Sequence, residues 1–134
     1  MNITNLVSTI DYALATDISL IRVTASEVRL TSDVNWTQVH IKPFPNLSIS
    51  DKIEDKNKIW TAELTFFTCQ SIPRYSRLVW RLGLTNGRYI LIGDGKRPYP
   101  VCSFSETMPE SPADNQLMEI KVTYSTARII PHIV

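Results

Sequence analysis

The residues with the most chemical potential in this sequence are arginines interleaved with aromatic side chains. Residues 74–81 read Arg-Tyr-Ser-Arg-Leu-Val-Trp-Arg. Cations beside aromatic rings can bind single-stranded nucleic acid through phosphate contacts and base stacking. The alternation of this segment instead favours Trp80 in a protein core with Leu78 and Leu82, and arginines at the surface or paired with carboxylates. We therefore expect no nucleic-acid partner.

A second basic segment, Gly93-Asp94-Gly95-Lys96-Arg97, resembles a phosphate-binding loop only superficially. It lacks the Walker spacing between glycine and lysine, the hydroxyl residue after the lysine, and a predicted helix behind it. A tight turn at the end of a hairpin is the favoured interpretation.

Catalytic and metal-binding patterns are absent from the sequence. His40 and His132 are the only histidines, and no spacing gives either one an acid–base partner. Asp51, Glu54 and Asp55 do not follow a calcium-loop pattern, and lysines are interleaved with them. We expect a protein that is not an enzyme, with no cofactor and no metal site.

The two cysteines, Cys69 and Cys102, form neither a zinc quartet nor a C-x-x-C pair. Both lie among apolar or strand-forming residues, which predicts buried, inert thiols. A disulfide between them is left open, because its geometry cannot be tested from sequence.

The remaining candidates for binding are surface cations and aromatic residues. Aromatic side chains dominate interface energetics, although a β core would explain the same residues. The candidate binding residues are Trp36, Arg77, Arg81, Lys96, Arg97 and Tyr99, and Tyr75 and Phe104 are further possible interface anchors.

The formal net charge is +1, so overall charge indicates neither nucleic acid nor an anionic membrane as partner. No apolar run approaches the ~18 residues of a membrane span. The charge is uneven, however. Residues 74–97 hold six basic side chains against Asp94, and residues 104–120 hold four acidic side chains and no basic one. Neighbouring strands that offset each other's charge would explain this pattern.

Composition favours strands over helices. Val, Ile and Thr together account for 37 of the 134 residues, whereas Ala and Gly number 6 and 4. Branched side chains suit a pleated surface and lose rotamer freedom in a helix. The length predicts one domain covering residues 1–134.

Period-two alternation identifies two clear strands. In Ile59–Thr68, Trp60, Ala62, Leu64 and Phe66 share one face, and Leu117–Ser125 alternates in the same way. Weaker patterns predict strands at 18–24, 27–31, 36–42, 101–105 and 127–132. Residues 5–15 fit either a short helix or a strand, residues 50–58 read as a solvated loop or helical turn, and residues 106–115 read as a proline-bearing break.

Asn86-Gly87 between two apolar runs predicts a hairpin with a two-residue turn. This register sets Leu84 opposite Tyr89, Leu82 opposite Leu91 and Trp80 opposite Gly93. Together these patterns predict an all-β fold, a β-sandwich or small barrel of about 7–9 short, mainly antiparallel strands.

The C-terminal half carries a resemblance to a known group of proteins. Asn86-Gly87-Arg88 leads into Tyr89–Gly93, the proline-bearing segment 97–101, the polar break 110–115, an alternating strand and Pro131. This order over residues 80–131 resembles small β proteins encoded in phage and prophage structural gene clusters of gut bacteria. The resemblance implies a virion component of the tail or baseplate, located in the cytoplasm during assembly or in the virion.

Two functions are therefore expected. The first is a phage-type structural or assembly protein that acts through protein partners or self-association. The alternative is a ligand-binding β-sandwich or barrel for a carbohydrate or an apolar small molecule, with a deep pocket or a strip of aromatic residues such as Trp36 and Tyr99.

Overall fold

The computed structural model describes residues 7–31, 33–42, 45–73, 76–96, 98–106 and 118–134. These segments form eleven strands and one 3-10 helix, with no α-helix among them. The strands are β1 (Val7–Leu14), β2 (Leu20–Thr24), β3 (Glu27–Leu30), β4 (Thr37–Val39), β5 (Asn46–Glu54), β6 (Asn57–Thr68), β7 (Leu78–Leu84), β8 (Tyr89–Ile92), β9 (Val101–Glu106), β10 (Met118–Thr126) and β11 (His132–Ile133), and the 3-10 helix is η1 (Ala15–Asp17).

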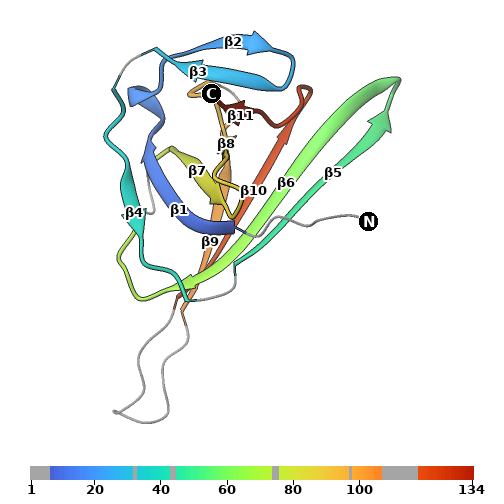
Figure 1. Cartoon of the computed structure of the whole chain (residues 1–134). Helices are drawn as coiled ribbons and strands as arrows, with labels where there is room; N and C mark the ends of the chain where they lie inside the picture. The colour runs from blue at the N-terminus through green and yellow to red at the C-terminus, as the bar shows by residue number, and fades with distance from the viewer. Residues whose placement is uncertain (1–6, 32, 43–44, 74–75, 97, 107–117) are drawn as a thin grey trace, which may run out of the picture.

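The strands form two sheets that pack as a β-sandwich (Figure 1). The seven-stranded sheet has the order β2-β3-β11-β8-β7-β1-β4, and the four-stranded sheet has the order β5-β6-β10-β9. Every pairing is antiparallel except that of β3 with β11. The all-β fold expected from composition and alternation is therefore confirmed, with more strands than the seven to nine expected.

The main core lies between the two sheets. Trp80 of β7 is fully buried, and its ring lies 5.7 Å from that of Phe66 and 5.8 Å from that of Tyr12, measured between centroids. The alternation predicted for β6 and β10 is confirmed, because Ala62, Leu64, Phe66, Ile120, Val122 and Tyr124 all contribute to this core. Alternate residues of each strand thus point toward the opposite sheet.

A second, smaller core covers the other face of the seven-stranded sheet. It contains Val79 of β7, Leu91 of β8, Val28 of β3 and Ala15 of η1. Half-buried side chains around it include Trp36 and Tyr99. The two central strands β7 and β8 are therefore buried on both faces, which explains their nearly continuous apolar sequence.

The predicted register of the β7–β8 hairpin is wrong by one residue. Trp80 pairs with Ile92 and Leu82 pairs with Ile90. The N–H of Gly87 donates to the carbonyl of Leu84, and the N–H of Leu84 donates to the carbonyl of Arg88. Only Gly87 of the turn has a positive φ, of 85°. The connection is thus a three-residue loop with its last residue left-handed, rather than a two-residue turn.

This shift of register exchanges the two faces of β8. Ile90 and Ile92 join the main core, and Leu91 moves to the second core beside Val79. A slip of one residue moves each side chain of a strand to the opposite face. The pattern of β8 could not reveal the error, because all three of these residues are apolar.

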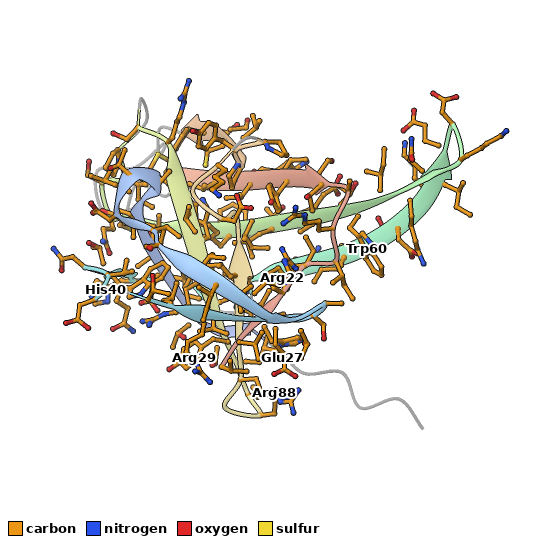
Figure 2. The ribbon with its side chains drawn as sticks, turned by 90° about the horizontal axis from the view of Figure 1, so that it is seen from above. Arg22, Glu27, Arg29, His40, Trp60 and Arg88 are labelled. Carbon is orange, nitrogen blue, oxygen red and sulfur yellow. The ribbon has the colours of Figure 1, made fainter. Side chains whose placement is uncertain are left out.

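The prediction of a loop or helical turn over residues 50–58 is also wrong. β5 pairs with β6 as far as Glu54 opposite Asn57, and Asp55 and Lys56 form the turn with φ of 49° and 67°. Every residue from 48 to 58 is exposed. This end of the hairpin, which we call the ribbon arm (residues 48–58), extends away from the sandwich in both views (Figures 1 and 2).

Among the weaker predictions, the strand alternative for residues 5–15 is confirmed from Val7 to Leu14. The expected strand over residues 127–132 is wrong for its first five residues, since β11 contains only His132 and Ile133. Most of the predicted proline-bearing break lies outside the described residues. The prediction of buried thiols is wrong for Cys69, which is exposed, whereas Cys102 is half-buried and both are free.

Candidate functional site

The outer face of the seven-stranded sheet carries an arginine held by three partners. Arg81 lies directly opposite Asp11 in the β1–β7 pairing. Its Nη2 and Nε atoms donate to Asp11 Oδ2 at 2.8 and 3.0 Å. The guanidinium carbon lies 4.7 Å from the ring centroid of Trp36 and 4.9 Å from that of Tyr89. Arg81 is thus both an ion-pair donor and a cation over aromatic rings.

This arrangement stabilises the outer surface of the sheet and does not form an accessible binding site. The side chain of Asp11 is only 9% exposed and that of Arg81 is 27% exposed. A carboxylate this buried requires a charged, hydrogen-bonding partner. Both donors of Arg81 that face Asp11 are engaged, so the pair has a structural role in holding β1, β7 and Trp36 together.

A second cation lies over an aromatic ring on the same face. The guanidinium carbon of Arg77, just before β7, lies 4.5 Å from the ring centroid of Tyr99. The Tyr99 ring packs against the second core, as does Trp36. Four of the predicted binding residues, Trp36, Arg77, Arg81 and Tyr99, therefore lie around one small core. Each of the two rings has a guanidinium against it.

Lys96 is one of the residues that line a cavity of about 590 Å³. The cavity is lined by the η1–β2 segment, by the loop that follows β8, and by the last residue of β10 with the two residues after it. Arg97, the sixth predicted binding residue, lies outside the described residues. Lys96 is therefore part of the cavity lining and not of the aromatic–arginine pairs, although Ile18 and Leu20 belong to both the cavity lining and the second core.

A second hollow, also of about 590 Å³ but more open, lies near the edge strand β4. It is lined by His40, Ile41, Lys42, Thr68, Cys69 and Gln70. The two histidines do not meet there, because His132 is on β11 and three strands separate it from β4.

Two buried groups have raised pKa values. Burial raises the pKa of the Cys102 thiol to about 11, and the nearby Trp80 indole opposes this shift. The buried Trp80 Nε1 atom forms no regular hydrogen bond with any described residue. Its interaction with the Cys102 sulfur is therefore weak. Burial also raises the pKa of Tyr124; a hydrogen bond with Thr126 opposes the shift, and the more distant Asp94 adds to it.

The described residues contain no group of three or more His, Cys, Asp or Glu side chains that could hold a metal ion. Within the same part of the chain, no helix is long and apolar enough to cross a membrane.

The ribbon arm differs from these sites because both of its faces are open. Ile53 is 77% exposed and Ile49 is 40% exposed, and both lie on the face that continues into the main core through Ala62. Trp60 lies near the base of the arm (Figure 2), with Lys58 Nζ 5.0 Å from its ring centroid. The arm therefore carries apolar side chains beyond the edge of the sandwich.

The sequence patterns did not identify four residues at these sites. Asp11 and Tyr89 complete the Arg81 cluster, and Arg22 and Arg128 line the cavity with Lys96. A lone aspartate between Ile10 and Tyr12 was the available signal for Asp11, because a carboxylate in an apolar strand needs a cation opposite it. No local signal places Arg22 near Arg128, since they are about one hundred residues apart.

Comparison of the chain with protein-family models, with curated proteins and with solved structures yields no match.

Proposed function

We propose that the protein is a non-enzymatic assembly protein that acts through protein–protein contacts, with the ribbon arm as its contacting element. The observation that supports this proposal is an eleven-residue segment, 48–58, that is exposed throughout and still forms a regular two-stranded ribbon. A two-stranded hairpin by itself is marginally stable in water. A binding surface on a partner would give the apolar residues of the arm the packing that they lack.

The arm also has a free edge. Among the strands that the structure describes, β5 lies at the edge of the four-stranded sheet and pairs only with β6. Edge strands commonly pair with a strand of another chain, and main-chain hydrogen bonds then supply affinity. Charged side chains on β5, including Asp51, Lys52 and Glu54, would limit unspecific edge pairing. These features support a specific contact with a second copy or with a dedicated protein partner.

We further propose that this assembly belongs to a phage-type virion, as a tail or baseplate component, with the protein in the cytoplasm during assembly or in the virion. Support comes from the resemblance of residues 80–131 to proteins of phage structural gene clusters. Neighbouring genes test this assignment. Capsid, tail-tube or tape-measure genes beside the coding sequence are the expected result, and a metabolic operon would contradict it.

Light scattering after size-exclusion chromatography tests the arm. We expect the mass to rise with concentration for the unaltered chain and to stay monomeric for Ile53→Asp. Val101→Asp is the matched control, because Val101 is 68% exposed and lies on β9 at the opposite edge of the same sheet. A monomer at every concentration, alone and with its neighbouring gene products, would overturn the proposal, as would equal loss of association in both variants.

A ligand-binding β-sandwich is the second candidate, and the cavity of about 590 Å³ is the observation that favours it. Its volume lies within the ~300–1,000 Å³ typical of ligand sites. A glycan array and a lipid screen test the carbohydrate and apolar forms of this candidate. Binding to either would support it, and no binding in both would contradict those two ligand classes.

A further inference from the structure

The cavity beside Lys96 is built from three segments that are distant in the sequence. The η1–β2 segment contributes Ile18, Ser19, Leu20 and Arg22, and the loop after β8 contributes Asp94, Gly95, Lys96 and Pro98. The third segment, at and just after the end of β10, contributes Thr126, Ala127 and Arg128. Three of the lining side chains are cations and one is a carboxylate. The cavity therefore has a formal excess of two positive charges in a protein whose net charge is +1.

The close docking of the β8 loop defines one wall of this cavity. Gly95 has a φ of +82°, and a Cβ atom at this position would lie 2.9 Å from the carbonyl oxygen of Ala15 in η1. Glycine is needed there both for its backbone conformation and for the close approach. The N–H of Lys96 donates to Asp94 Oδ1 at 3.0 Å, which fixes the turn. The loop thus brings Lys96 and Asp94 into the lining of the cavity.

Among the described residues, the three cations of the cavity, Lys96, Arg22 and Arg128, have no ion-pair partner. Nη1 of Arg22 donates to the carbonyl of Ala25 at 3.1 Å, which leaves its other N–H donors available. Figure 2 shows Arg22 on the body of the protein and not on the projecting tip of the ribbon arm.

Two of the three cations and the carboxylate also line a second, smaller hollow. Arg22, Asp94, Thr126 and Arg128 line both the cavity and a small hollow of about 10 Å³ that Tyr124 also lines. Asp94 raises the pKa of Tyr124, and Arg22 and Arg128 lower it, which places all three charges within electrostatic reach of one phenol. An excess of positive charge in the lining of one cavity favours a multiply charged anion.

We propose that this cavity binds a small phosphate monoester. Its phosphate group is held by Arg22, Lys96 and Arg128, and its organic part lies against Ile18, Leu20 and Pro98. A phosphate monoester carries about −1.5 to −2 charges at pH 7, which matches the excess of two positive charges. Arginine donors also suit phosphate oxygens, because the guanidinium presents several N–H groups in one plane.

This binding site does not rest on the assembly role, and the ligand class differs from a carbohydrate or an apolar molecule. The two proposals also fail separately. A change in the ribbon arm affects association and leaves phosphate binding intact, whereas a change in the cavity does the reverse.

Titration of the full chain with phenyl phosphate, followed by ¹H–¹⁵N NMR at low ionic strength, tests the site. We expect shifts at Leu20, Gly95, Lys96 and Ala127. Phenyl phosphate should bind about tenfold more tightly than phenyl sulfate, which has a single charge, and phenol should not bind. Absence of localised shifts, or equal affinity for phenyl sulfate, would overturn the proposal. Equal affinity for inorganic phosphate would overturn the role assigned to the organic part.

Three substitutions give a directional test. Arg22→Gln and Arg128→Gln should each weaken phenyl phosphate binding about tenfold, because each removes a charged donor. Asp94→Asn should strengthen binding severalfold, because it removes the carboxylate charge and keeps the Oδ1 acceptor for Lys96. The expected order of affinity is therefore Asp94→Asn, unaltered chain, then the two arginine variants.

Arg29→Gln is the matched control, since Arg29 is an exposed arginine on the neighbouring strand β3 and does not line the cavity. It should leave binding unchanged. Arg22, Arg29 and Arg128 are all exposed, so the unaltered NMR fingerprint of each variant will show that the fold is kept. Weaker binding in Arg29→Gln equal to that in Arg22→Gln would show unspecific attraction and overturn the site.

Discussion

The β7–β8 hairpin and the ribbon arm of the β5–β6 hairpin are both two-stranded hairpins, but their surroundings are opposite. Both are antiparallel and both turn through left-handed residues. β7 is covered on both faces, by the main core against Trp80 and by the second core against Val79. The ribbon arm is exposed on both faces from residue 48 to residue 58.

The difference shows how much of a strand's stability comes from its neighbours. Leu78, Val79, Trp80 and Leu82 are each at most 1% exposed. In the arm, the side-chain interactions include exposed ion pairs, such as Lys58 Nζ to Asp51 Oδ2 at 2.9 Å, and the contact of Lys58 with the Trp60 ring. An exposed pair of this kind contributes about 0–1 kcal/mol. The arm therefore depends on its ladder of backbone hydrogen bonds, and the central hairpin depends on packing.

The largest expected effect on the free energy of unfolding distinguishes a tryptophan of the central hairpin, Trp80, from one at the base of the arm, Trp60. Trp80→Ala should lower the free energy of unfolding by about 3–5 kcal/mol, because it empties a fully buried site between Phe66 and Tyr12. Trp60→Ala, at the half-buried base of the arm, should cost about 1–2 kcal/mol. Urea unfolding monitored by circular dichroism measures both. Equal losses would show that the arm is as tightly packed as the body.

A smaller loss is expected for the ion pair on the outer face of the central hairpin. Arg81→Leu should cost about 3 kcal/mol, because it leaves the Asp11 carboxylate buried without its cation. Asp11→Leu combined with Arg81→Leu should recover most of this loss, as apolar residues can replace a buried pair. The matched arm variant Lys58→Leu, which breaks an exposed pair, should cost under about 1 kcal/mol. A double-variant cycle with no coupling between Asp11 and Arg81 would contradict the structural role of this pair.

The pH dependence of stability gives a further test of the contrast between buried and exposed side chains. Burial raises the pKa of the Cys102 thiol from 9.0 to about 11, so the folded chain holds this proton more tightly than the unfolded chain. The resulting stability is present below pH 9 and is lost as the pH rises from 9 to about 11. The raised pKa of Tyr124 adds to the loss above pH 10. Denaturant titrations at each pH should show a fall of up to about 2 kcal/mol from Cys102.

Cys102→Ala should make this fall shallower. Cys69→Ala, which removes an exposed thiol, is the matched control and should keep the original slope. A slope that does not respond to Cys102→Ala would assign the loss above pH 9 to other groups.

The smallest effect is expected at the tip of the ribbon arm. Lys56 has a φ of 67°, a conformation that costs a side-chain-bearing residue about 1 kcal/mol. Lys56→Gly should therefore leave the stability unchanged or raise it by up to about 1 kcal/mol, whereas Asn57→Gly, within β6, should lower it slightly. Thermal unfolding and amide hydrogen exchange of the arm measure the two variants. A loss in Lys56→Gly equal to that in Asn57→Gly would contradict the left-handed turn.

Alternation predicted the strands whose two faces differ in polarity. β6 and β10 have apolar and polar faces, and their inward residues follow the expected pattern. β8 has three consecutive apolar residues, 90–92, so its pattern fits either register, and the hydrogen bonds of Leu84 with Gly87 and Arg88 decide between them. The β5–β6 hairpin escaped detection because its tip has no buried face to impose a pattern, and because its turn contains Asp55 and Lys56 without glycine.

At the candidate site too, the sequence identified individual residues but not the contacts between them. The segment 74–81 singled out Arg77 and Arg81 as basic residues beside aromatics, and Trp36 and Tyr99 were named as candidates from elsewhere in the chain. Their pairing as Arg81 with Trp36 and Arg77 with Tyr99 depends on contacts between segments that are more than twenty residues apart. Lys96 was named with them as a surface cation, whereas the fold places it in a cavity lining with Arg22 and Arg128.

The amino-acid sequence by itself determined that this protein is an all-β protein, because branched residues and period-two alternation act within single strands. It also determined the position of the β7–β8 hairpin, through a turn that needs Gly87 in a left-handed conformation. Only the tertiary structure decided which face of β8 enters which core, which strand ends project beyond the sandwich, and which cations share a cavity. These features depend on contacts between distant segments, and local preferences leave such contacts undetermined.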